Sequence, residues 1–158
     1  MTLGHSTRLI AVAFALAGPF GLASQPSWAE PTQGWKSYIE RDYQAAEKHW
    51  RTDVARGNPN GAFGLAILAE RAGDAKGATE WYEKAALGGV PSAQVLTGQR
   101  YAEGVGVERN PVRAYAWFAR AMAAGVPNAE KLRDRLAATM TPSQIKEADA
   151  LAETLAKP

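Results

Sequence analysis

The stretch that decides the fold is GVPSA at residues 89–93, which returns as GVPNA at residues 125–129. The same shift of 36 residues relates eight small or aromatic residues: Ala78, Trp81, Tyr82 and Ala85 correspond to Ala114, Trp117, Phe118 and Ala121. One cycle earlier, a shift of 32 residues carries Gly57 onto Gly89 and Trp50 onto Tyr82. Periods of this size are typical of stacked helical hairpins, in which each hairpin covers the apolar face of its neighbour.

The spacing inside each copy also indicates helices. Ala78, Trp81, Tyr82 and Ala85 stand at positions i, i+3, i+4 and i+7, which form one stripe of a helix. Alanines let two helices approach closely, and an aromatic pair fills the space between layers. We therefore expect Trp81 and its counterpart Trp117 to be buried in equivalent places of adjacent layers.

Proline, asparagine and glycine mark the helix boundaries. Asn58, Asn110 and Thr141 each precede a proline, so they are expected N-caps, and Thr141 with Gln144 fits a capping box. Gly57, Gly89 and Gly125 stand where helices should end, because glycine tolerates the left-handed conformation. Helices are expected at residues 33–41, 43–56, 59–72, 75–87, 91–103, 111–124, 127–139 and 142–155.

These features predict an all-α fold, an α/α superhelical solenoid of stacked antiparallel helix hairpins. The repeats are expected at about 57–88 and 89–124. An N-terminal cap is expected at 33–56 and a C-terminal cap at 125–155. The second copy holds Tyr101, Gly104 and Gly106 in a turn, and at least one of the two glycines should have a positive φ.

Together these residues resemble the Sel-1-like repeat family, relatives of the tetratricopeptide repeats, over roughly residues 42–130. The clearest copy runs from Ala93 to Gly125. The resemblance implies an α/α superhelix and an adaptor role, often in bacterial envelope or secreted proteins. The sequence departs from the family at Thr97, where leucine is preferred, and at Asn110, where aspartate is usual. His49 stands where the later copies have tryptophan, which places it in a core-facing position.

The first 29 residues have the pattern of a secretory signal peptide. A basic start that includes Arg8 is followed by an uncharged apolar run at residues 9–23 and by the small residues around Ala29. We expect cleavage after Ala29, which leaves residues 30–158 as a periplasmic or secreted protein with no stable membrane anchor. The apolar run is shorter than the ~20 residues that span a bilayer.

The composition argues against most catalytic and metal sites. The chain of 158 residues has no cysteine and two histidines, and its net charge is +2. Thiol catalysis and cysteine-bound zinc are excluded, and a nucleic-acid partner is not expected at this charge. We expect no catalytic residue, cofactor or metal. Glu80 and Glu83, beside Lys76 and Lys84, are interpreted as a solvated helix face.

The same interpretation applies to a small basic cluster, Lys131, Arg133 and Arg135, which acidic residues interrupt.

The candidate binding residues are those that point away from the core stripe on the first helix of each hairpin: Phe63, Ile67, Val95 and Gln99. The repeat offset continues this register to Lys131 and Arg135. Two interpretations stay open. The residues form an exposed patch that needs a partner, or Trp35, Tyr38 and Ile39 of the first helix cover them.

The sequence therefore predicts a non-enzymatic exported scaffold that binds a protein or peptide through its concave face. One alternative is a module that binds peptidoglycan or exopolysaccharide, which exposed aromatic faces with Asn and Gln would favour. A less favoured alternative is a hydrolase on the same fold, which clustered acids with perturbed pKa values in a deep pocket would favour.

Overall fold

The computed structural model describes residues 33–156, which form eight α-helices and no strand. The helices are α1 (Gln33–Ile39), α2 (Tyr43–Ala55), α3 (Pro59–Arg71), α4 (Ala75–Leu87), α5 (Pro91–Glu103), α6 (Pro111–Ala123), α7 (Ala129–Ala137) and α8 (Pro142–Thr154). Each corresponds to a predicted helix, and every end lies within two residues of its predicted position. The predicted signal peptide lies outside the described residues.

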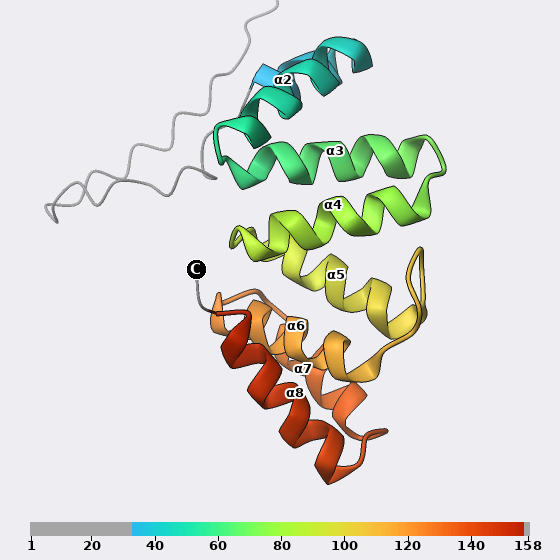
Figure 1. Ribbon diagram of the computed structural model, residues 1–158, viewed down its shortest axis with the longest axis vertical. Coiled ribbons are helices and arrows are strands. Elements are labelled where there is room, and N and C mark those ends of the chain that lie inside the picture. The colour runs from blue at the N-terminus through green and yellow to red at the C-terminus, as the bar shows by residue number, and fades with distance from the viewer. Residues whose placement is uncertain (1–32, 157–158) are drawn as a thin grey trace, which may run out of the picture.

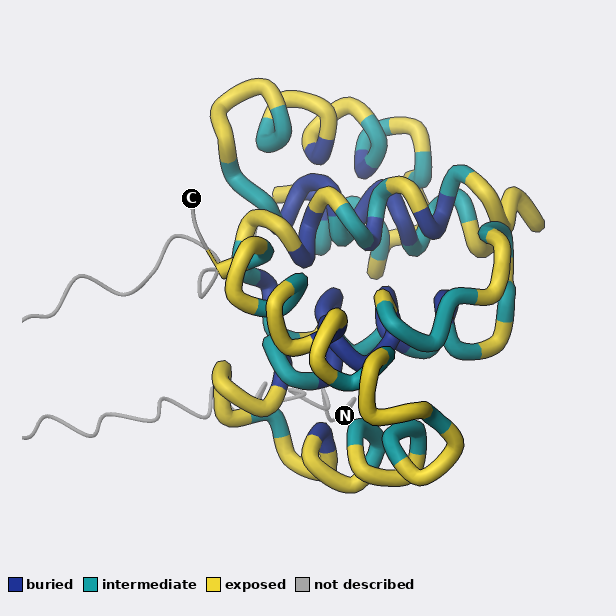
Figure 2. Tube along the Cα trace, turned by 60° about the horizontal axis from the view of Figure 1, so that its bottom comes forward, coloured by how far each residue is buried: buried dark blue, intermediate teal, exposed yellow. Residues whose placement is uncertain are grey.

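The helices pack as consecutive antiparallel hairpins that stack along one axis (Figure 1). The stack runs from α1 and α2 at one end to α7 and α8 at the other, where α7 and α8 both pack against α6. Figure 2 shows buried backbone on the faces between layers and exposed backbone on the outer helices. This arrangement confirms the predicted all-α solenoid. None of the helices in residues 33–156 has the length and the apolar run that a membrane crossing requires.

The predicted signals set the helix ends. The side chains of Asn58 and Asn110 accept hydrogen bonds from the backbone N–H groups of Asn60, at 3.0 Å, and Arg113, at 2.9 Å. Thr141 forms the predicted capping box. Three predicted helix-ending glycines have positive φ, namely Gly57 at 77°, Gly89 at 86° and Gly125 at 77°.

A single tryptophan ties the first hairpin to the next. Trp50 on α2 is fully buried, and its ring lies between Gly34 of α1 and Gly64 of α3. A Cβ atom at either glycine would overlap the indole ring, so both positions require a residue without a side chain. Trp35 of α1 meets the same ring edge to face, with 5.2 Å between ring centroids.

The predicted core stripe is buried in both copies except at one position. Ala78, Tyr82 and Ala85 on α4 are buried, as are Ala114, Trp117, Phe118 and Ala121 on α6, and Tyr101 on α5. The prediction that Trp81 is buried like Trp117 is wrong: Trp81 is half-buried. The ammonium group of Lys84 lies 5.1 Å from the centre of its ring, which is the geometry of a cation–π contact at the protein surface.

His49 also departs from its prediction. It is exposed, while the adjacent Trp50 occupies the core. Neighbouring residues on a helix point about 100° apart, so a core-facing Trp50 turns His49 outward.

The turn after α5 has the predicted conformation. Gly104 and Gly106 both have positive φ, at 77° and 68°. Gly106 packs directly on the backbone of Ala75 and Lys76 at the start of α4, where a Cβ atom would not fit. The hydroxyl of Thr79 lies 2.8 Å from the carbonyl oxygen of Val105. The turn therefore joins the α5–α6 hairpin to α4.

Candidate interaction surface

The four candidate binding residues lie at equivalent positions on two successive first helices. Phe63 and Ile67 are on α3, and Val95 and Gln99 are on α5. All four are half-buried. We call this set the α3–α5 face.

The apolar members of this face also support the interior. The ring of Phe63 meets Tyr82, with 5.6 Å between centroids, and it meets Trp35 of α1 at 6.3 Å. Ile67 and Val95 pack against the edges of buried clusters. The expectation that these side chains point away from the core is therefore wrong for Phe63, because that ring packs between aromatic residues of α1 and α4.

The first helix covers the α3–α5 face only in part. This was the second of the two interpretations that the sequence left open. Trp35 contacts Phe63, whereas Tyr38 packs on Trp50 and on Tyr43. Ile39 is 78% exposed, so it covers nothing. Solvent consequently reaches part of the α3–α5 face, whose four residues are all half-buried.

Charged and polar side chains bridge the helices beside this face. Arg100 of α5 is buried and forms an ion pair with Glu70 at the end of α3. Tyr82 of α4 donates a hydrogen bond of 2.7 Å to the other carboxylate oxygen of Glu70. The Arg100 guanidinium also lies 5.0 Å from the centre of the Tyr82 ring. These contacts link three consecutive helices.

A second bridge of the same kind joins α4, α5 and α6. The Tyr101 hydroxyl lies 3.1 Å from the Glu83 carboxylate, and Arg113 donates a 2.7 Å hydrogen bond to the Tyr101 oxygen. The interpretation of Glu83 as part of a solvated face is wrong, because its carboxylate contacts Tyr101 and Arg113 of the next hairpin. Glu80 does pair with Lys76 on the surface, at 3.9 Å.

The bridging tyrosines act as hydrogen-bond donors. Burial raises the pKa of Tyr82, and the neighbouring Glu70 raises it further. Burial and the Glu83 carboxylate likewise raise the pKa of Tyr101. Both hydroxyls therefore remain protonated at neutral pH and hold the carboxylates in place, which is a structural task.

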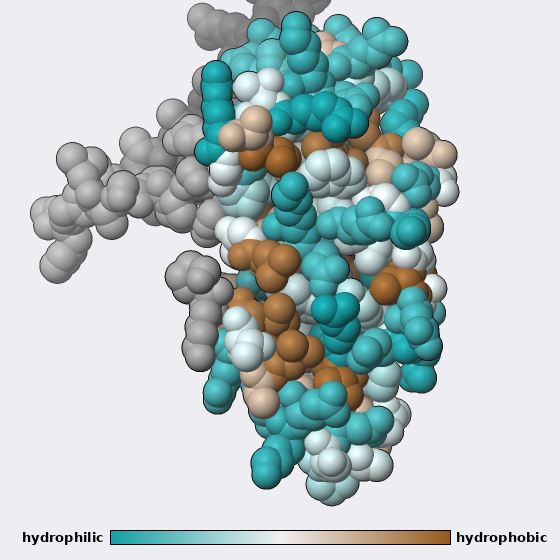
Figure 3. Space-filling model, viewed as in Figure 1, coloured by the Kyte–Doolittle hydropathy of each residue, from teal (hydrophilic) through white to brown (hydrophobic). Residues whose placement is uncertain are grey.

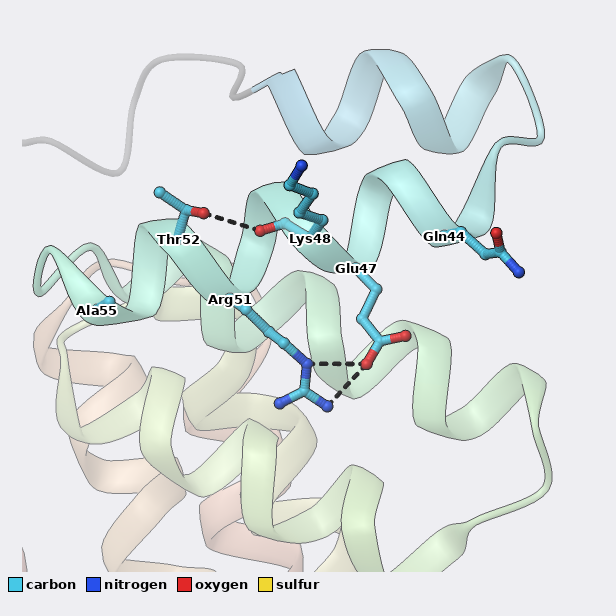
Figure 4. A pocket seen from close by; sticks show the side chains of 6 residues that line it. All are labelled: Gln44, Glu47, Lys48, Arg51, Thr52 and Ala55. Carbon is cyan, nitrogen blue, oxygen red and sulfur yellow. Dashed lines mark hydrogen bonds and ion pairs between the residues drawn. The ribbon is translucent and has the colours of Figure 1, made fainter.

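Two shallow hollows border α2. Figure 4 shows one of about 570 Å3 along the outer face of α2, between Gln44 and Ala55. Two of its charged groups are paired, because Arg51 donates a 2.8 Å hydrogen bond to Glu47. A second hollow of about 320 Å3 is bordered by Tyr43, whose ring is covered by the Arg71 guanidinium at 4.1 Å.

The acidic and basic residues that the sequence analysis considered do not gather into a site. Within residues 33–156, no three His, Asp or Glu side chains gather in a way that would hold a metal ion. In the basic cluster, Arg133 pairs with Asp134 at 2.6 Å, while Lys131 and Arg135 are exposed. Figure 3 shows apolar side chains across the middle of the visible face and hydrophilic side chains at both ends.

Comparison with known proteins agrees with this geometry. The Sel1 repeat family model matches residues 62–90 and 91–126. The two matched segments follow one another and correspond to the α3–α4 and α5–α6 hairpins. The first repeat carries Phe63 and Ile67, and the second carries Val95 and Gln99, so the α3–α5 face belongs to the repeats. Sel1-repeat solenoids typically mediate protein–protein interactions.

Solved structures of similar proteins have the same architecture. One is a protective antigen present in uropathogenic Escherichia coli strains and described as displaying an SLR fold. Its sequence is 29% identical to this chain, and the match covers 77% of this chain with a TM-score of 0.68. Another is a Sel1 repeat protein from Oxalobacter formigenes, 30% identical, with a TM-score of 0.59 over 66% of this chain. The matches span 28% and 44% of those two chains. No curated protein sequence matches the chain.

The polar bridges between these helices were not foreseen from the sequence. Glu70 and Arg100 are 30 residues apart. The position equivalent to Arg100 in the preceding layer is Leu68, so the repeat pattern gives no sign of an ion pair there. One signal was available, since Arg100 stands one helical turn after Thr97, a position at which the Sel-1-like family prefers leucine.

Proposed function

We propose that this chain is a non-enzymatic, exported scaffold that binds a protein or peptide partner through the α3–α5 face. The observation that carries the proposal is the pairing of half-exposed apolar side chains, Ile67 and Val95, with the Gln99 amide at equivalent positions of two consecutive repeats. A partner can bury the apolar groups and hydrogen-bond to the amide.

The rigidity of the face supports this proposal. The Glu70–Arg100 and Glu83–Arg113 pairs fix α3, α4, α5 and α6 relative to one another. A preformed surface loses little conformational entropy when it binds, which favours affinity without reactive groups. The ionic groups beside the face are paired with each other, so they are not set up for acid–base catalysis.

Site-specific photo-crosslinking in cells tests the proposal. A photoreactive amino acid at Gln99 is compared with the same amino acid at Gln44, an exposed glutamine on the outer face of α2. We expect a crosslinked protein or peptide of defined mass from position 99 and none from position 44. Adducts from neither position, or the same adducts from both, would contradict the proposal. An adduct that peptidoglycan-degrading enzymes remove would favour the glycan-binding alternative instead.

A further inference from the structure

The second helices of two successive hairpins carry a cation at equivalent positions. The shift of 36 residues relates Lys84 of α4 to Arg120 of α6. Each cation stands one helical turn after a tryptophan, Trp81 or Trp117. Because the α3–α5 face lies on the first helices of these hairpins, the two cations belong to a different surface of the protein.

Arg120 is a partly buried cation without a counter-charge. Its side chain is half-buried, and its Nε–H group is buried without a hydrogen-bond acceptor among the residues that the structure describes. Two other arginines that are not exposed, Arg100 and Arg133, each pair with a carboxylate. A partly desolvated and unpaired guanidinium has lost hydration free energy that a bound carboxylate can restore. Arg120 is therefore suited to receive an anion.

The chain around Arg120 is free of acidic residues over a long stretch. α6 contains two arginines and no aspartate or glutamate, and neither residue type occurs at 84–102 or at 109–129. From α8, Asp149 faces Tyr115, which lies about 140° around α6 from Arg120. The excess of positive charge on this side of α6 favours a negatively charged partner.

A small apolar hollow lies beside the other cation, Lys84. It has a volume of about 160 Å3, and its lining includes Val54, Pro59 and Ala62. The Lys84 ammonium group lies over the Trp81 ring and forms no ion pair within residues 33–156. A cation next to an apolar hollow fits a carboxylate together with a neighbouring aliphatic side chain.

Exposed apolar surface also lies on the side of α4 that meets α6. The two helices run in the same direction, since each is the second helix of its hairpin (Figure 1). They are joined by the ion pair of Glu83 and Arg113, at 3.7 Å. Leu87 stands one turn after Glu83 and is 58% exposed, and Arg120 stands two turns after Arg113. This register brings Leu87 and the Arg120 cation to the same end of the two helices.

We propose that Lys84, Leu87 and Arg120, which we call the α4–α6 edge, bind an acidic peptide segment of a partner protein. One carboxylate of the segment pairs with the Arg120 guanidinium and another with the Lys84 ammonium group. An aliphatic side chain of the segment enters the hollow beside Lys84. A peptide fits better than a polyphosphate chain, which has no apolar group for the hollow or for Leu87. This binding goes beyond the proposed function, because it uses the second helices and not the α3–α5 face.

An NMR titration of the full chain tests the proposal. The probe is a short peptide with blocked ends that alternates glutamate and valine. The Nε–H signal of Arg120 is the readout, because a buried N–H group exchanges slowly with water. We expect a saturable shift of this signal and of the Leu87 amide, and none with a matched peptide that alternates glutamine and valine. Equal shifts with both peptides, an unmoved Arg120 signal, or tighter binding of a short polyphosphate would overturn the proposal.

Substitutions separate binding from stability. Arg120→Met removes the charge and keeps an unbranched apolar side chain, so it should weaken peptide binding about tenfold or more without lowering the melting temperature. Lys84→Met should also weaken binding, and it serves alone if Arg120→Met does not fold. Arg135→Met, which removes an exposed arginine of α7, is the control and should leave the affinity unchanged. Gln99→Lys should leave it unchanged too, which distinguishes this surface from the α3–α5 face. Wild-type affinity in both methionine variants of the α4–α6 edge, or an equal loss in Arg135→Met, would contradict the proposal.

Discussion

At the scale of single residues, close packing of glycine against aromatic rings fixes the distance between helices. Gly64 receives the Trp50 ring, and Gly98 receives the Phe118 ring in the next hairpin. Glycine is unfavourable inside a helix by about 1 kcal/mol relative to alanine, so its presence here reflects the space that the rings need.

Gly64→Ala should therefore destabilise the protein although alanine is the better helix former. The new methyl group would overlap the Trp50 ring, and overpacking of this kind costs about 1–3 kcal/mol. Urea denaturation measures the change. Ser92→Ala, at an exposed position of α5, is the control and should leave stability unchanged or slightly higher. An increase in stability for Gly64→Ala would show that the ring is not held there.

The buried tyrosines predict how stability responds to alkaline pH. The pKa of Tyr82 is raised in the folded protein, chiefly by burial, whereas tyrosine in the unfolded chain has a pKa of about 10. The folded state thus keeps a proton that the unfolded state releases. The stabilisation is present in full below pH ~10 and is lost as the pH rises toward the raised pKa.

We expect the free energy of unfolding to fall above pH ~10, and to fall less steeply in Tyr82→Phe. Near neutral pH the same substitution should cost about 0.5–1.5 kcal/mol, the usual net value of one hydrogen bond. Urea denaturation at a series of pH values gives both quantities. An identical alkaline slope for Tyr82→Phe and the wild type would refute the assignment to Tyr82.

At the scale of helices, the two tryptophans of the repeat differ although the sequence makes them equivalent. Trp117 is 1% exposed and belongs to the main core cluster. Trp81 sits at the edge of that cluster under Lys84. Trp117→Ala should cost about 3–5 kcal/mol, and Trp81→Ala should cost less. Thermal and urea unfolding of the two variants check the order; equal losses would mean that Trp81 is as buried as Trp117.

Local chemistry explains why the helices were predictable. Most boundaries are set by a proline, a capping side chain or a left-handed glycine, and these act within a few residues of the chain. Side chains that cross between layers were not predictable. Glu83 looked solvated because its neighbours in sequence are lysines, but Tyr101 and Arg113 reach it from the next hairpin. Phe63 was likewise misplaced, because the repeat register does not show that Trp35 folds back onto it.

At the scale of the whole molecule, the repeats form a continuous stack whose α3–α5 face is partly open to solvent. Export is a separate prediction that rests on the pattern at residues 1–29. The protein purified from the producing cell should begin at Glu30, which N-terminal sequencing measures directly. An intact Met1 in the membrane fraction would contradict cleavage after Ala29.

The measurement that tests the central claim most directly is the affinity of the crosslinked partner for two variants with the same substitution. Gln99→Lys places a charge on the α3–α5 face, and Gln44→Lys places it on the outer face of α2. Titration calorimetry should show at least tenfold weaker binding for Gln99→Lys and wild-type affinity for Gln44→Lys, with equal melting temperatures. Wild-type affinity for Gln99→Lys, or an equal loss in both variants, would contradict binding through the α3–α5 face.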